Sequence, residues 1–218
     1  MSGSKLSKEI IKDITSTTSE LRNMRFLRDE NGVAQYAHPG NLLELTFHGK
    51  NDSNSIMYDK HISCEQLMAV LLKQRQYTFL LYDKSIIQAE FLIEEESIIK
   101  ERLIFIKKHN RIWEVDEINA CDASDEDWFS EEAGIPIMIR IDYDPKEHKD
   151  GIHASSHLTL SNHESCRIPM KEAVTFSEFI RFILFHFYDL HLPKAEFRLA
   201  NAEEITETEK KQIHMYWK

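Results

Sequence analysis

The chain has 218 residues, a formal charge of −10 and 42% hydrophobic residues. At this length a folded chain buries roughly 70% of the surface that it exposes when unfolded, so a core forms without disulfides or metal. General electrostatic binding of nucleic acid needs a basic excess. The charge therefore argues against a nucleic-acid binder of that kind, although a local basic strip lies within residues 100–111.

The three cysteines, Cys64, Cys121 and Cys166, are far apart and form no CxxC pair. This pattern supports neither a disulfide framework nor a four-cysteine zinc site. The first residues contain no apolar segment of a secretory signal. No stretch reaches about 18 consecutive apolar residues, the length of a membrane-spanning helix. We expect a cytoplasmic protein that does not enter the membrane.

Hydrophobic spacing in the first half predicts helices and strands in alternation. Residues 5–22 carry apolar side chains at helical spacing and predict an amphipathic helix. Ser63 and Gln66 form a capping box that opens a helix ending near Lys73. Alternating or β-branched segments predict strands at 43–47, at 77–82, and in an antiparallel hairpin of 86–93 and 98–106.

Residues 114–132 contain nine carboxylates and no lysine or arginine. Runs of like charge are usually solvated, so an acidic loop is the first interpretation. A docking surface for a basic partner is the alternative.

The C-terminal part predicts two capped helices. Thr175 and Glu178 open a helix that ends near Tyr188 and is apolar over most of its circumference, which is typical of a helix buried in its own domain or against a partner. Thr206 and Glu209 open a last helix that ends in Met215-Tyr216-Trp217. We expect a single α+β domain over residues 1–218. It has a mostly antiparallel sheet, an N-terminal helix, a central apolar helix near the C-terminus and a short terminal helix.

The candidate site lies on two predicted strands. Because side chains alternate along a strand, Arg140 and Asp142 face away from the neighbouring isoleucines, and His157 shares a face with Thr159. If the strands pair, these four side chains lie together, and the next turn adds Arg167. Such a set supplies a proton carrier, a carboxylate and guanidinium donors for an anion. It predicts a nuclease or phosphodiesterase in which His157 is the acid/base, Asp142 orients it, and Arg140 and Arg167 hold phosphate.

The same residues allow other interpretations. In a structural one, Arg140 and Asp142 form a partly buried ion pair while His157 and Thr159 bond to backbone or to each other. His157-Leu158-Thr159 also fits the H-x-T pattern of two-histidine phosphoesterases, with His61-Ile62-Ser63 as a second copy. Zinc is a further alternative, with ligands of suitable type at His153, His157, His163 and Cys166.

Several motifs resemble an uncharacterised bacterial family, a domain of unknown function. They are R-x-D-Y-D-P from Arg140, H-x3-H-L from His153, C-R-I-P from Cys166 and a phenylalanine-rich segment that closes with Phe187-Tyr188. The similarity covers about residues 5–190 and leaves 191–218 as a C-terminal extension. In the family, the position of Thr159 is more often a second histidine. The resemblance implies an α+β protein of the bacterial cytoplasm, encoded among restriction, toxin–antitoxin or phage-defence genes.

Three functions remain open at this stage. The first is an accessory or interaction subunit of a phage-defence or toxin–antitoxin type system, with a protein partner or a second copy of the chain bound through apolar helix surface. The second is the phosphodiesterase-like enzyme described above. The third is a sensor of a small ligand that uses the same polar face.

Overall fold

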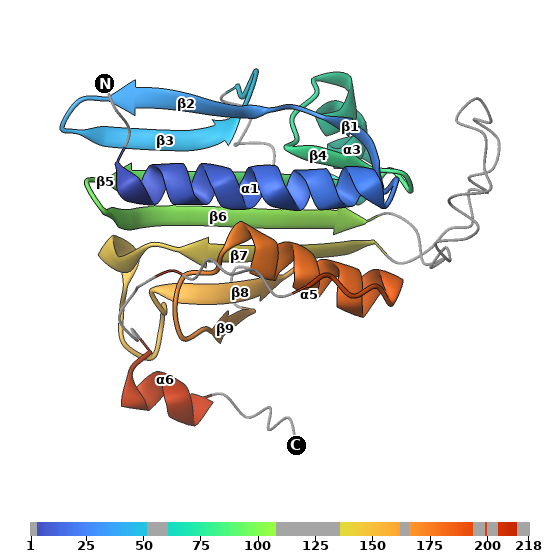
Figure 1. The fold of residues 1–218 in the computed structure, drawn as a ribbon. Coiled ribbons are helices and arrows are strands. Elements are labelled where there is room, and N and C mark those ends of the chain that lie inside the picture. Colours follow the sequence, from blue (N-terminus) through green and yellow to red (C-terminus); the bar gives the residue numbers. More distant parts are fainter. Residues whose placement is uncertain are drawn as a thin grey trace.

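The fold rests on one sheet of nine strands. The computed structural model describes residues 4–51, 61–107, 136–161, 166–193, 199 and 205–212. The order across the sheet is β1-β4-β5-β6-β7-β8-β9, with β3 also beside β5 and β2 beside β3 (Figure 1), and every pair is antiparallel. The strands are β1 (Leu27–Glu30), β2 (Val33–His38), β3 (Leu42–Phe47), β4 (Phe79–Leu81), β5 (Ile86–Glu94), β6 (Ser97–Lys107), β7 (Ile137–Tyr143), β8 (Ser156–Leu160) and β9 (Arg167–Pro169).

Two helices, α1 (Lys5–Asn23) and α5 (Phe176–Tyr188), lie next to each other on one face of the sheet (Figure 1). Helix α3 (Cys64–Lys73) packs on the opposite face, and the short α6 (Glu207–Gln212) follows near β9. These features confirm the predicted α+β class, the N-terminal helix and the short terminal helix. No helix in the described ranges is long and apolar enough to cross a membrane.

The predicted capping boxes are present. At Ser63 and at Thr175 the hydroxyl accepts the N–H of the third helical residue, and the side chain of that residue accepts the N–H of the cap. Thr206 and Glu209 make the same exchange at α6. The acidic segment 114–132 and the aromatic end Met215-Tyr216-Trp217 lie outside the described residues.

The two faces of the sheet have different compositions because side chains alternate along each strand. The face under α1 and α5 is apolar, and its largest cluster joins Phe91 of β5, Phe105 of β6 and Ile141 of β7 to Phe179 and Ile183 of α5. A smaller cluster packs α3 on the other face through side chains that include Leu67, Leu71, Ile86, Ile104 and Met138. Elsewhere, that second face carries a large group of polar side chains.

Hydrogen bonds connect helix α1 to two other parts of the fold. The carboxylate of Glu96, in the turn between β5 and β6, accepts the N–H groups of Lys5 and Leu6 at 2.9 and 2.8 Å. Buried Asp13 accepts the N–H of Ser177 at the start of α5 at 3.0 Å. In the middle of α1, four hydroxyl groups donate to backbone carbonyls three or four residues earlier in the helix. The donors are Thr15, Ser16, Thr18 and Ser19.

Helix α5 packs its apolar side on the sheet but leaves two phenylalanines outside. Phe179, Ile180 and Ile183 are fully buried, whereas Phe182 is 37% and Phe185 48% exposed. The prediction of a buried, central helix therefore holds for the side of α5 that faces the sheet, and not for its outer side. Its outer side is an apolar surface that the described residues do not cover.

A buried ion pair joins three elements at one end of the sheet. Lys107 at the end of β6 contacts Asp83 in the turn between β4 and β5, and both side chains are 3% exposed or less. The hydroxyl of Tyr188, the last residue of α5, donates to Asp83 at 2.7 Å. Paired and hydrogen-bonded charges of this kind persist in a core because separating them leaves an uncompensated buried charge.

Glu101 of β6 is a second buried carboxyl, on the helix-covered face. One of its oxygens accepts the N–H of Val174, just before α5, at 3.2 Å, and the other has no hydrogen-bond partner among the described residues. Burial raises the pKa of Glu101 well above 4.5, and the nearby carboxylates of Asp142 and Glu178 act in the same direction. The folded protein therefore keeps this group protonated at pH values where the unfolded chain ionises it.

We expect Glu101→Gln to change how stability depends on pH. The raised pKa of Glu101 gives stability that is complete below pH 4.5 and is lost as pH rises toward the higher pKa of the folded state. Glutamine cannot ionise, so the advantage of the variant in free energy of unfolding should grow from pH 4 to pH 8, as measured by urea denaturation. The exposed control Glu94→Gln should run parallel to the wild type, and parallel curves for Glu101→Gln would contradict the buried protonated carboxyl.

Candidate functional site

The polar part of the second sheet face is organised in rows across the strands. In the first row, Glu90 of β5, Arg102 of β6, Asp142 of β7 and His157 of β8 stand opposite one another in register. Directly paired residues of antiparallel strands have their side chains on the same face. The pairing of β7 with β8, on which the sequence hypothesis depended, is therefore present, and Asp142 and His157 are direct neighbours.

Asp142 is held by two arginines. One carboxylate oxygen accepts the Nε–H of Arg102 at 3.0 Å, and the other accepts the Nε–H of Arg140. Burial of the carboxyl favours its neutral form, but Arg140 and Arg102 outweigh burial and lower the pKa of Asp142. Asp142 is therefore ionised at neutral pH, as the structural interpretation of an Arg140–Asp142 ion pair also requires.

His157 is oriented by the backbone. Its Nδ1 lies 3.0 Å from the carbonyl oxygen of Ala154, which can only accept, so Nδ1 carries the proton. Nε2 lies 3.8 Å from the carboxylate of Asp142, beyond hydrogen-bonding distance. The predicted role of Asp142 as the group that orients His157 is thus corrected, because Ala154 makes that contact. Burial lowers the pKa of His157 below 6.5, despite the opposing effects of Ala154 and Asp142.

The second row contains donors that the structure leaves unused. Arg140 of β7, Thr159 of β8 and Arg167 of β9 stand opposite one another. The hydroxyl of Thr159 and the Nε of Arg167 are buried and have no hydrogen-bond partner among the described residues. Thr159 is completely buried, and Arg140 and His157 are nearly so. The predicted residues are gathered on one face, but the part of it around His157 is buried and not open to solvent.

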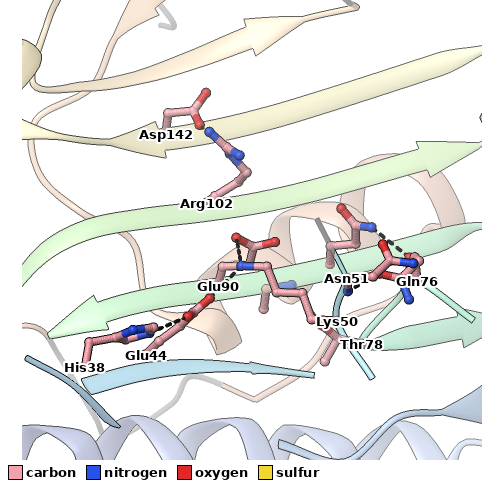
Figure 2. A network of polar contacts seen from close by, with 11 residues as sticks. His38, Glu44, Lys50, Asn51, Gln76, Thr78, Glu90, Arg102 and Asp142 are labelled. Carbon is pink, nitrogen blue, oxygen red and sulfur yellow. Dashed lines mark hydrogen bonds and ion pairs between the residues drawn. The ribbon is translucent and has the colours of Figure 1, made fainter. Parts of the chain in front are cut away.

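An open hollow lies beside this group, over β3, β5 and β6. It has a volume of about 460 Å³, and its polar lining consists of His38, Glu44, Lys50, Glu90, Lys100 and Arg102. Figure 2 shows this network, in which Arg102 reaches toward Asp142 from the strand next to Glu90. None of these six residues was predicted as a site residue from the sequence. The alternation of Glu90 with Ala89 and Phe91 in β5 was the signal that could have placed that residue on a polar face.

Lys50 links the two carboxylates of the hollow. Its ammonium group lies 2.6 Å from Glu44 and 2.8 Å from Glu90, and Glu44 also contacts His38 at 2.8 Å. Burial alone would lower the pKa of Lys50, but the two glutamates outweigh it and raise that pKa. Burial likewise opposes ionisation of Glu44, while Lys50 and His38 outweigh it and lower the pKa of Glu44. The hollow therefore has charged, fixed walls.

The predicted zinc ligands are only partly close together. The rings of His153 and His157 are 4.8 Å apart, Cys166 is half-buried, and His163 lies outside the described residues. Within the described ranges, the three side chains whose ligand atoms approach each other closely enough for a metal are instead His148, Asp150 and Glu209. Glu209 contacts His148 at 3.2 Å and Asp150 contacts Thr206, so these contacts fasten α6 to the turn after β7.

The second copy of the H-x-T pattern has another role. The hydroxyl of Ser63 accepts the N–H of Gln66 and caps α3, and His61 is exposed. Ser63 is therefore explained by helix capping.

A protein-family model described as an uncharacterized conserved protein (DUF2290) matches residues 26–217. The matched region begins after α1 and includes the tail from residue 191 onward, which the motifs in the sequence did not cover. No curated protein matches the chain, and no solved structure matches it.

The contacts of His157 predict a neutral ring in the Nδ1–H form at pH 7. Burial lowers its pKa, so the ring should become protonated only below pH 6.5. NMR titration of the ring carbon and nitrogen shifts, assigned through His157→Gln, measures both properties, and the urea-unfolded chain is the reference. A pKa above 6.5 or a proton on Nε2 would contradict the described contacts.

Proposed function

The chain belongs to the family of uncharacterized conserved proteins DUF2290, and we propose that it binds a phosphate ester on the polar face of its sheet and cleaves it with His157 as proton carrier. The proposed binding groups are Arg140, Thr159 and Arg167. Asp142 positions Arg140.

The unused donors of Thr159 and Arg167 carry this proposal. The structural interpretation accounts for Arg140 and Asp142 through their ion pair, and for His157 through Ala154. Among the described residues, it leaves the buried hydroxyl of Thr159 and the buried Nε–H of Arg167 without acceptors. An unsatisfied buried polar group costs about 1–3 kcal/mol. Because both groups donate and stand opposite each other in register, one oxyanion between them would satisfy both.

Local charge supports an anionic ligand. The chain has an overall charge of −10, but the described strands β6 to β9 place the guanidinium groups of Arg102, Arg140 and Arg167 on this face. Asp142 is shared by two of these arginines, and Arg167 has no part in that contact. A phosphate group could pair with Arg167, because arginine forks match the geometry of phosphate oxygens.

The state of His157 suits a base. With its proton on Nδ1, its Nε2 can take the proton of an attacking hydroxyl or water as that oxygen bonds to phosphorus. The bond from phosphorus to the leaving oxygen then breaks, and the imidazolium returns its proton to that oxygen. Arg140, Arg167 and Thr159 would stabilise the charge on the phosphoryl oxygens meanwhile.

Thr159→Val separates this proposal from a purely structural role. Valine removes an unsatisfied buried hydroxyl, so the ligand-free variant should be more stable by about 1 kcal/mol in urea denaturation. It should bind inorganic phosphate about tenfold more weakly by calorimetry, because a hydrogen bond to an anion is lost. Arg167→Met should weaken phosphate binding by a similar or larger factor, whereas the exposed control Arg28→Met should not. Unchanged phosphate affinity in Thr159→Val would overturn the proposed site.

His157→Gln tests the catalytic part in the same experiments. We expect it to retain phosphate binding and to lower turnover of bis(p-nitrophenyl) phosphate or single-stranded RNA by about 10²–10⁴-fold, the usual contribution of a general acid/base. Equal turnover in this variant and the wild type would remove His157 from the mechanism.

A second candidate function, an accessory subunit of a defence or toxin–antitoxin type system, is supported by the outer side of α5. Phe182 and Phe185 are exposed, and their rings lie 4.6–5.0 Å from those of His186 and His191. Aromatic side chains are enriched where proteins bind each other.

The double variant Phe182→Ser/Phe185→Ser tests this second function. It should keep its melting temperature within a few degrees, because both side chains are exposed, and should lose co-purification with the product of a neighbouring gene. Tyr36→Ser, an exposed aromatic on β2, is the matched control. Retained co-purification in the double variant would exclude this surface of α5.

A further inference from the structure

We infer that the ligand is a nucleoside monophosphate, or the terminal nucleotide of a nucleic acid, whose nucleoside lies in the hollow over β3, β5 and β6. This inference rests on the proposed phosphate site and names its substrate class. The two sites share one sheet face and are adjacent through Arg102, which lines the hollow and donates to Asp142.

The hollow has the size and lining of a small-molecule site. Its volume of about 460 Å³ lies within the range of about 300–1,000 Å³ usual for such pockets. Besides its charged groups, it is lined by Pro39, Leu42 and Leu92. Apolar side chains of this kind suit the flat, weakly hydrated faces of a nucleobase.

The charged walls of the hollow indicate how such a ligand is oriented. Glu44 and Glu90 are acceptors held in place by Lys50, and a carboxylate accepts from a ribose hydroxyl in dinucleotide-binding folds. Lys50, the cation between them, is already paired with both carboxylates. The phosphate end is therefore directed away from Glu44 and Glu90, toward Arg102 and the arginines beyond it.

The distance between the hollow and His157 matches the length of a single nucleotide. Arg102, Asp142 and His157 stand opposite one another on three successive strands. Neighbouring strands are about 4.8 Å apart, so His157 lies about 10 Å from the position of Arg102 across the sheet. A mononucleotide with its base beside β5 can therefore present its phosphate near His157, whereas free phosphate can use only the far end.

Calorimetry with AMP, GMP, CMP and UMP, each compared with inorganic phosphate and ribose 5-phosphate, tests the inference on the full chain. We expect at least one nucleotide to bind tenfold or more tightly than both smaller ligands. Leu92→Trp should fill the hollow and remove this advantage while leaving phosphate affinity unchanged, and Glu90→Gln should reduce the advantage. The bulky control Leu160→Trp, at an exposed position of β8, should bind like the wild type.

The outcomes separate the two proposals. If phosphate binding depends on Arg167 but no nucleotide binds better than ribose 5-phosphate, the nucleoside inference is overturned and the phosphate site stands. If the nucleotide advantage survives in Leu92→Trp, the hollow is not the nucleoside site. If neither phosphate nor nucleotides bind the wild type, the proposed function fails and the inference fails with it.

Discussion

The register of the antiparallel strands β5–β8 is the constraint on which the rest of the structure depends. Side chains alternate strictly between the faces, so a shift of β7 by one residue would exchange Ile139 and Ile141 for Arg140 and Asp142 under the helices. Burial of the isoleucines against α5 therefore fixes the position of the charged side chains on the opposite face. One strand register therefore produces both the apolar core and the rows of polar side chains.

This coupling explains how an acidic chain forms a sheet face on which several arginines gather. Each strand contributes one or two polar residues, and pairing aligns them into rows that no single segment contains. Asp142 can accept from both Arg102 and Arg140 only because β6 and β7 are neighbours. At β8 and β9 the rows continue with Thr159 and Arg167, for which no carboxylate of the described strands stands opposite. The proposed phosphate site rests on this difference between the two ends of the rows.

Local sequence signals predicted most of the fold and about half of the polar face. The boxes at Ser63 and Thr175 specified helix starts because capping needs only four consecutive residues. The alternation around Arg140 and His157 placed both on one face, and a short connection brought their strands together. Lys50 and Glu44 could not be found in this way, because their position depends on the pairing of β3 with β5, nearly 50 residues apart. The exposure of Phe182 could not be predicted from hydrophobic periodicity either. The sequence of an apolar helix does not show which of its sides other elements cover.

The serines and threonines in the middle of α1 lower the intrinsic stability of this helix. Serine and threonine are poor helix formers, and hydroxyls that bond back to carbonyls of the preceding turn weaken a helix further. Helix α1 therefore owes its persistence to docking on the sheet, and its first turn is held by Glu96 from the distant hairpin. Removal of α1 would expose the apolar core residues that it covers. Exposed apolar surface of this kind favours aggregation.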